Sequence, residues 1–152
     1  MPFSQKCQYA LRAVFEVAKQ ANEGPIKIHA IAAAQAIPPR FLAAILHQLK
    51  RGGFVQSRRG AEGGYLLAKD ASQISVGDII RFIEGPILPV ACIASDQQTT
   101  ECPLNTQCVF MSMWKDAQRA VKSVYDNTTI QDLIEREAAM TSRADCKLTH
   151  SA

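Results

Sequence analysis

Apolar residues recur at helical spacing over residues 7–21, where most positions three or four apart are Ala, Val, Leu or Cys. Ser4 stands just before this pattern and suits an N-cap, while the Gly and Pro in the stretch 22–25 end it. A shorter, Ala-rich pattern follows over 29–35, and Pro39 fits the first turn of another helix. The beginning of the chain is therefore predicted as three short helices.

The third of these helices is expected to end near Gly52, and its two faces differ sharply. Its predicted buried stripe is Leu42, Ile45, Leu46 and Leu49. The residues off that stripe are Arg40, Phe41, Ala43, Ala44, His47 and Gln48. Two short helices joined by a tight turn, the second with an exposed face, are typical of a helix-turn-helix. The N-terminal half of such a helix meets base edges, where Arg40 suits guanine or phosphate and Phe41 suits a thymine methyl or a sugar.

A hairpin with a basic, glycine-rich tip is predicted next. Residues 54–57 indicate a strand, 58–64 a turn and 65–67 the returning strand, which together form a wing. Glycines let a loop approach a phosphate backbone closely, and arginine can enter a narrow minor groove, although arginines can also simply solubilise a turn. The residues predicted to contact DNA are Arg40, Phe41, Ala44, His47, Arg58, Arg59, Gly60, Gly63 and Gly64.

The second half of the chain contains one long amphipathic pattern. Ser75 first caps a short helix that Gly85 ends, and a long helix is predicted from Val109 onwards. A face this long exceeds what one small subunit buries, so we interpret it as a dimerisation helix, since palindromic operators call for twofold proteins. The residues assigned to dimerisation are Phe110, Met113, Trp114, Ala117, Val121 and Val124.

The predicted fold class is mainly α with a small β-wing: a winged helix-turn-helix DNA-binding domain plus a long dimerisation helix. Residues 1–85 form the winged helix-turn-helix region and 86–108 a cysteine-bearing sensor loop. Residues 109–140 form the dimerisation helix and a short final helix, and 141–152 are expected to be a flexible tail.

Charge supports this division. Residues 1–70 carry ten Lys and Arg against four acidic residues, a net charge of +6, whereas residues 71–152 carry seven against ten, a net charge of −3. A basic front half suits a nucleic-acid face. No apolar run approaches the length of a membrane span and no secretory signal precedes the first helix, so we expect a cytoplasmic protein with no membrane partner. No nucleophile–base pair or nucleotide loop indicates an enzyme.

Three of the five cysteines, Cys92, Cys102 and Cys108, lie in one polar stretch with no amphipathic period. Free thiols are usually buried as small apolar groups, so this clustering favours a shared inorganic ligand. An iron–sulfur cluster, 2Fe–2S or 4Fe–4S, is favoured over structural zinc, which normally completes four Cys and His ligands. Two alternatives remain open: unligated thiols that respond through disulfide or sulfenate chemistry, and control by a partner protein.

Several motifs resemble the winged-helix regulators of the IscR, NsrR and RirA type. They include residues 6–13, 49–55 and 74–80, the wing sequence Arg59-Gly60-Ala61-Glu62-Gly63-Gly64-Tyr65-Leu66-Leu67, and the three cysteines before Trp114. This resemblance covers about residues 3–137. It implies a dimeric bacterial transcription factor, usually a repressor, in which three cysteines of this loop hold the cluster and its state tunes operator binding. It also implies that Arg59 is the arginine that enters the minor groove.

The chain departs from that family pattern at the positions that bear on a fourth cluster ligand. The gap from Cys92 to Cys102 is wider than in the iron–sulfur biogenesis regulators, and Met111 stands where they have histidine. Gln8 stands where the nitric-oxide-sensing relatives have a carboxylate. The fourth ligand is therefore open between Cys7, Asp96, Glu101, a residue of a second subunit and a small exogenous molecule; the helical phase of Cys7 itself predicts burial.

Overall fold

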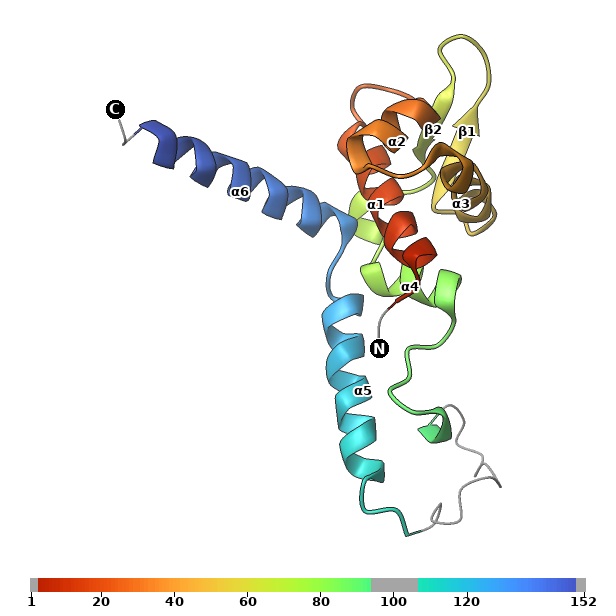
Figure 1. Cartoon of the computed structure of the whole chain (residues 1–152), viewed down its shortest axis with the longest axis vertical. Helices are drawn as coiled ribbons and strands as arrows, with labels where there is room; N and C mark the ends of the chain where they lie inside the picture. Colours follow the sequence, from red (N-terminus) through yellow and green to blue (C-terminus); the bar gives the residue numbers. More distant parts are fainter. Residues whose placement is uncertain (1–2, 94–106, 150–152) are drawn as a thin grey trace.

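The computed structural model describes residues 3–93 and 107–149, with side chains described as far as residue 142. Helix α1 (Gln5–Lys19) begins at the predicted cap, where the Ser4 Oγ accepts a hydrogen bond from the Cys7 N–H at 3.1 Å. Its apolar face packs against α2 (Ile28–Gln35) and α3 (Pro39–Arg51), as Figure 1 shows. The apolar side chains of these helices form the main hydrophobic core.

The helix-turn-helix is formed by α2 and α3, which confirms the predicted architecture. The turn between them begins at Ala36, whose φ of 48° lies in the left-handed region. In α3 the buried residues are the four of the predicted stripe, Leu42, Ile45, Leu46 and Leu49. Within the described residues, no single helix has the length and apolar composition of a bilayer span; α2 and α3 reach these criteria only as a pair, and they are bent by 114°.

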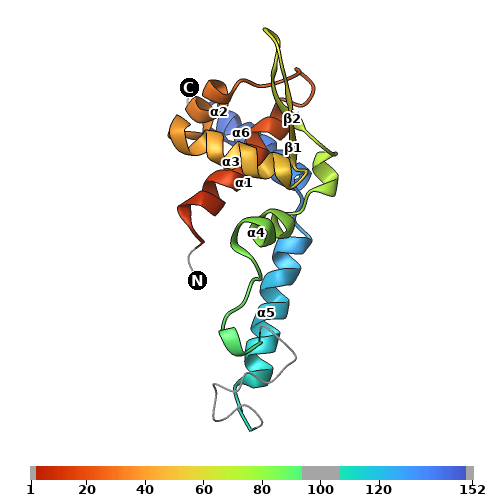
Figure 2. The same cartoon turned by 90° about the vertical axis from the view of Figure 1, so that its right-hand side faces the viewer.

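The wing is an antiparallel pair formed by β1 (Val55–Arg58) and β2 (Gly64–Leu67). Val55 pairs with Leu67 and Arg58 pairs with Gly64. The first strand thus begins one residue later than predicted, and the second begins one residue earlier. Phe54 precedes β1 and is buried in the core, which fixes the base of the hairpin. The result is a short hairpin whose tip projects from a packed base (Figure 2).

The chain continues through the 3-10 turn η1 (Ala71–Gln73) and helix α4 (Val76–Glu84), which complete the winged helix-turn-helix region of residues 3–85, called the reader from here on. The predicted cap of α4 is a complete capping box, in which Ser75 and Asp78 each accept a hydrogen bond from the backbone N–H of the other. Two orphan N–H groups at the start of the helix are thereby satisfied. Gly85 ends α4 with a φ of 89°, as its position in the sequence predicts.

Helix α5 (Met111–Asp126) runs away from the reader, and the 3-10 turn η2 (Ala91–Ile93) lies beside its far end (Figure 1). None of the residues of α5 is buried, whereas α1, α3 and α4 each have a buried apolar face. This agrees with the prediction of a long amphipathic helix that one chain does not cover.

The final helix differs from the prediction. Helix α6 (Ile130–Thr149) continues through most of the stretch 141–152 that was expected to be a flexible tail. The reason is local: residues 130–149 contain neither Gly nor Pro and are rich in good helix formers, so nothing in the sequence ends the helix early. Its first turns pack on α1 and η1, with Ile130 fully buried, while its far end projects from the body (Figure 1).

Hydrogen bonds and an ion pair join the junction of α5 and α6 to α4 and the residues just before it. The Val76 N–H donates to the Thr128 carbonyl at 2.8 Å and the Ile130 N–H donates to the Ile74 carbonyl at 2.9 Å. Arg81 of α4 also forms ion pairs with Asp78 and with Asp126 at the end of α5. Through these contacts, the long helix is tied at one end to the reader.

Candidate nucleic-acid interface and cysteine segment

The exposed face of α3 carries the residues that the sequence predicts for base contact. Arg40, Phe41, Ala44 and His47 are all exposed, and Phe41 retains 47% of its accessible surface. The Arg40 guanidinium lies over the Phe41 ring at 4.7 Å from its centroid. This contact holds a cationic donor and an apolar surface side by side at the first turn of the helix.

The tip of the wing places its two arginines in solvent on a tight turn. Arg58 ends β1 and Arg59 follows it, and both side chains are exposed. Gly60 has a φ of 105°, and the Gly63 N–H donates to the Gly60 carbonyl at 2.9 Å. A Cβ at Gly63 would lie 2.8 Å from the carbonyl carbon of Arg59, so the turn needs glycine there.

Two lysines near this surface were not predicted from the sequence. The Lys27 ammonium donates a hydrogen bond to the Ala61 carbonyl of the wing loop, and the Lys50 ammonium donates to the Ser57 Oγ of β1 at 2.6 Å. Both contacts join residues that are close only in the folded chain, so no local pattern reveals them. Helix α3 and the wing lie next to each other, and both views place them at the end of the molecule opposite the tip of α5 (Figures 1 and 2).

The structure describes two of the three clustered cysteines. Cys92 lies in η2 and Cys108 lies just before α5; both are half-buried and their thiols are unpaired. Cys102 lies outside the described residues, as do Asp96 and Glu101, two of the candidates for a fourth ligand. Among the residues that are described, no three His, Cys, Asp or Glu side chains come together as a metal site. The two described thiols are partly accessible soft donors, and η2, which bears Cys92, contacts the helix that begins three residues after Cys108, which fits thiolate ligation.

Cys7 lies in a different environment. It is completely buried in a second apolar cluster with Val76, Ile80 and Ile87, as its helical phase predicts. Burial, with a smaller contribution from the charge of Glu84, raises the pKa of its thiol to about 11. Because metal ligation requires the thiolate, this environment disfavours Cys7 as a fourth ligand.

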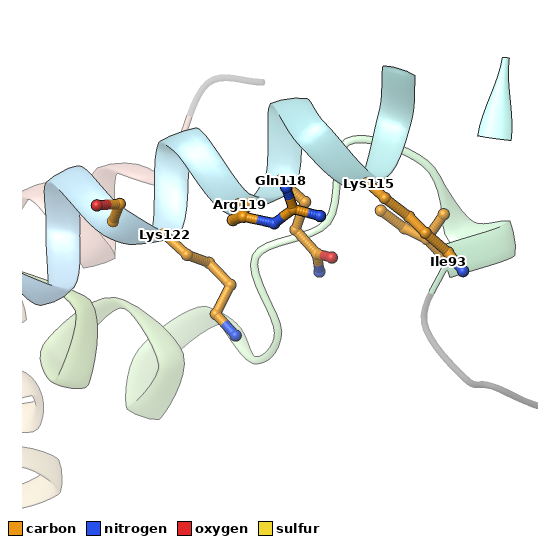
Figure 3. A pocket seen from close by; sticks show the side chains of 6 residues that line it. Ile93, Lys115, Gln118, Arg119 and Lys122 are labelled. Carbon is orange, nitrogen blue, oxygen red and sulfur yellow. The ribbon is translucent and has the colours of Figure 1, made fainter. Parts of the chain in front are cut away.

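A basic hollow borders the segment that bears Cys92. It has a volume of about 510 Å³ and is lined by Ile93 of η2 and by Lys115, Gln118, Arg119, Lys122 and Ser123 of α5 (Figure 3). Arg119 also pairs with Asp116 at 3.1 Å, but both side chains are largely exposed, so this pair contributes little. This cationic face of α5 was not predicted from the sequence.

The opposite face of α5 is apolar and open. Large apolar side chains remain accessible there: Phe110 at 57%, Met113 at 47%, Val121 at 41% and Val124 at 63%. Trp114 is half-buried and Ala117 is exposed, so the structure places all six predicted dimerisation residues on this long helix or directly before it. A groove of about 510 Å³ runs beside it, with Phe3, Ile87 and Tyr125 among its lining residues.

Known proteins are similar to this chain in both sequence and fold. A putative HTH-type transcriptional regulator of Mycobacterium tuberculosis is 36% identical over 133 residues, which cover 88% of this chain and 81% of the relative. The structure of CymR from Bacillus subtilis, described as a global cysteine regulator, superposes with a TM-score of 0.73 at 35% identity, covering 90% of this chain and 98% of that one. IscR from T. potens gives a TM-score of 0.72 at 30% identity, with 90% and 88% coverage.

The family model described as "Rrf2: Iron-dependent Transcriptional regulator" matches residues 3–136, which include the helix-turn-helix, the wing, the cysteine segment and α5. Both solved relatives have the same mainly helical fold with a two-stranded wing. On the match of helices, wing and sequence together, this chain belongs to the Rrf2 family of DNA-binding transcriptional regulators.

Proposed function

We propose that this protein is a homodimeric repressor of a palindromic operator, controlled by an iron–sulfur cluster that Cys92, Cys102 and Cys108 hold. The observation that carries the proposal is the position of the cysteine segment. Its two described thiols are half-buried and unpaired, and Cys108 lies three residues before a helix that is tied at its other end to the reader. A change at the thiols therefore acts directly on the long helix.

DNA reading is assigned to two surfaces. The first is the exposed face of α3, with Arg40, Phe41 and Ala44 in its N-terminal half and His47 further along, facing the major groove. The second is the wing, where Gly60, Gly63 and Gly64 allow close approach and Arg58 and Arg59 contact the backbone and the minor groove.

Association is assigned to the apolar face of α5. A protein that reads a palindrome needs a twofold partner, and the accessible Phe110, Met113, Val121 and Val124 give one continuous face for it. The cytoplasm is the proposed location, because this is where a bacterial regulator meets its operator.

Control follows from how α5 is held. An iron–sulfur cluster held by Cys92, Cys102 and Cys108 would supply a centre that responds to oxygen, nitric oxide or iron supply. Cys108 lies next to the start of α5, while Arg81 and Asp126 hold the other end of the helix to α4. Recognition helices of a dimer must lie about 34–36 Å apart, so a small rotation of α5 changes operator affinity.

The decisive experiment is an anaerobic reconstitution with iron and sulfide, followed by absorption spectra, metal counts and operator binding. We expect a coloured protein whose operator affinity differs from that of the colourless form. Cys92→Ala, Cys102→Ala and Cys108→Ala should each abolish the colour and the difference, whereas Cys146→Ala should leave both intact. Wild-type protein that stays colourless, or triple-cysteine variants that bind and release operator like the parent, would overturn the cluster proposal.

A second candidate keeps the DNA-binding role without metal. The half-buried, unpaired Cys92 and Cys108 are accessible to oxidants, and CymR is a similar regulator without a cluster, which is compatible with control by thiol oxidation or by a partner enzyme. Peroxide treatment of the colourless protein separates the two cases. An operator affinity that changes with peroxide and returns with a thiol reductant, without iron, supports this candidate.

A further inference from the structure

A lysine outside the wing forms a hydrogen bond with the wing loop, and this contact involves no DNA. The Lys27 ammonium, just before α2, donates a hydrogen bond to the carbonyl oxygen of Ala61 in the wing loop. These residues are 34 positions apart in the chain. Both residues are exposed, so the hydrogen bond crosses the surface between the segment before α2 and the wing loop.

The backbone next to Lys27 also holds the wing. The Ile26 N–H donates to the Tyr65 carbonyl at 3.0 Å, and the Tyr65 N–H donates to the Ile26 carbonyl at 2.8 Å. A Cβ at Gly64 would lie 2.5 Å from the Ile26 carbonyl oxygen, so this close approach requires glycine. Ile26 thus fixes the start of β2, next to the loop, and Lys27 extends the same attachment to the loop itself.

A similar support reaches the other strand. The Lys50 ammonium, in the last turn of α3, donates to the Ser57 Oγ of β1 at 2.6 Å. The two lysines therefore hold the wing from α2 on one side and from α3 on the other, and Arg58 and Arg59 lie between the two attachments.

Such supports matter because the wing is small. A two-stranded hairpin with four residues in each strand is marginal by itself, and its loop would otherwise be ordered only when DNA binds. Fixing the loop beforehand removes that ordering cost from binding. It also sets the distance between the wing arginines and the exposed face of α3, which must fit the spacing of adjacent grooves.

We infer that Lys27 is a positioning residue, which acts on DNA affinity through the wing arginines by binding the Ala61 carbonyl, and that Lys50 supports the same wing from α3. The inference rests on the proposed DNA contact by Arg59. It goes beyond that proposal because it assigns to Lys27 a role inside the protein, where a basic residue near DNA would ordinarily be assigned a phosphate.

A double-mutant cycle separates the two roles. The probe is a duplex selected by the unmodified protein from randomised DNA, and the variants are Lys27→Met, Arg59→Ala and the pair. We expect Lys27→Met to weaken binding about tenfold when Arg59 is present and less than about twofold when it is absent, because coupled residues are not additive. When Arg59 has already been replaced by Ala, adding Lys27→Met should leave the slope of log affinity against log salt unchanged, since Lys27 itself makes no phosphate contact. Additive losses, with a slope reduced by about one, would show a direct phosphate contact and overturn the inference.

A measurement without DNA tests the support itself. Trypsin cuts after Arg58 and Arg59, so its rate at these two bonds in the folded protein reports how freely the wing loop moves. We expect faster cleavage there in Lys27→Met than in the wild type, near-normal cleavage in Lys27→Arg, and no change in the matched control Lys122→Met on α5. Equal melting temperatures must accompany these results, because a globally destabilised protein is also cut faster.

The two measurements distinguish an error in the role of Lys27 from an error in the proposed DNA contact by Arg59. If Lys27→Met leaves wing cleavage unchanged, the positioning role is wrong whatever the DNA results are. If cleavage rises but Arg59→Ala has no effect on binding, the support is real and the proposed contact by Arg59 is wrong instead.

Discussion

The reader and the arm formed by the cysteine segment and α5 differ in where their apolar side chains lie. In the reader, Leu42, Leu46 and Leu49 of α3 are fully buried against α1 and the base of the wing. In α5, which has a comparable amphipathic pattern, no residue is buried, and Val124 retains 63% of its accessible surface. The apolar face of α3 is therefore covered by the same chain, whereas the apolar face of α5 is left exposed by it.

This difference separates the tasks of the two regions. The burial of apolar area stabilises the reader inside a single chain, so its shape does not depend on association. The arm buries little against its own chain, which is why we propose that a second subunit and the thiols at its end control its position. The comparison can be tested by changes whose effects should differ between the two regions.

The largest effect is expected in the core of the reader. Leu46→Ala should lower the free energy of unfolding by about 3 kcal/mol, because it removes a fully buried side chain and leaves a cavity. Val124→Ala on the open face of α5 should change the stability of the single chain by less than about 0.5 kcal/mol. Urea unfolding followed by circular dichroism measures both, and equal losses at every protein concentration would contradict the contrast.

The next effect concerns association through α5. Val124→Asp should weaken self-association by about 100-fold or more, because it places an unpaired charge in the proposed interface. Ser112→Asp, an exposed position on another face of the same helix, is the matched control and should associate normally. Analytical ultracentrifugation over a range of concentrations gives both dissociation constants. Dimers of unchanged affinity in Val124→Asp would place the interface elsewhere.

The reactivity of the cysteine thiols should also differ between the buried core of the reader and the arm. Iodoacetamide should label Cys92 and Cys108 at least about tenfold faster than Cys7 in the folded, metal-free protein. Cys7 is completely buried and the pKa of its thiol is raised to about 11, so its thiolate is scarce at neutral pH. Peptide mass spectrometry assigns each site, and denaturant should remove the protection of Cys7. Rapid native labelling of Cys7 would show that α1 and α4 separate readily.

The smallest effect concerns the cap of α4, where the two regions meet. Ser75→Ala should cost about 1 kcal/mol of stability, because it leaves an N–H at the helix start without its acceptor. Partial burial, the largest single influence, raises the pKa of Asp78, but its hydrogen bonds from Ser75 and Arg81 outweigh it and leave the pKa below its ordinary value of 3.8.

The sign of the pH dependence follows from that lowering. A carboxylate whose pKa is lower in the folded state stabilises the fold above its unfolded pKa, and this contribution is lost as the pH falls below about 4 through the folded value. Asp78→Asn should therefore flatten the loss of stability between about pH 5 and 3. Parallel acid titrations of the two proteins would argue that Asp78 contributes nothing there.

Much of the reader could be predicted because its signals are local. Ser4 and Ser75 cap helices where expected, Pro39 starts α3, and the stripe of α3 is buried as its period indicates. The predicted end of α6 was wrong. Chain termini are commonly frayed, but the stretch up to Thr149 contains no residue that breaks a helix. The candidate site is less complete: the sequence identified the wing arginines and the cysteines, and it missed Lys27, Lys50 and the basic face of α5.

The amino-acid sequence by itself determined which segments are helical, which faces are apolar and which residue types are available for DNA and for iron. These properties depend on neighbours within a few positions along the chain. The tertiary structure decided that α5 stays uncovered, that Arg81 joins it to the reader through Asp126, and that Lys27 reaches the Ala61 carbonyl. Such contacts join residues tens of positions apart, and packing brings them together only after every local element has formed.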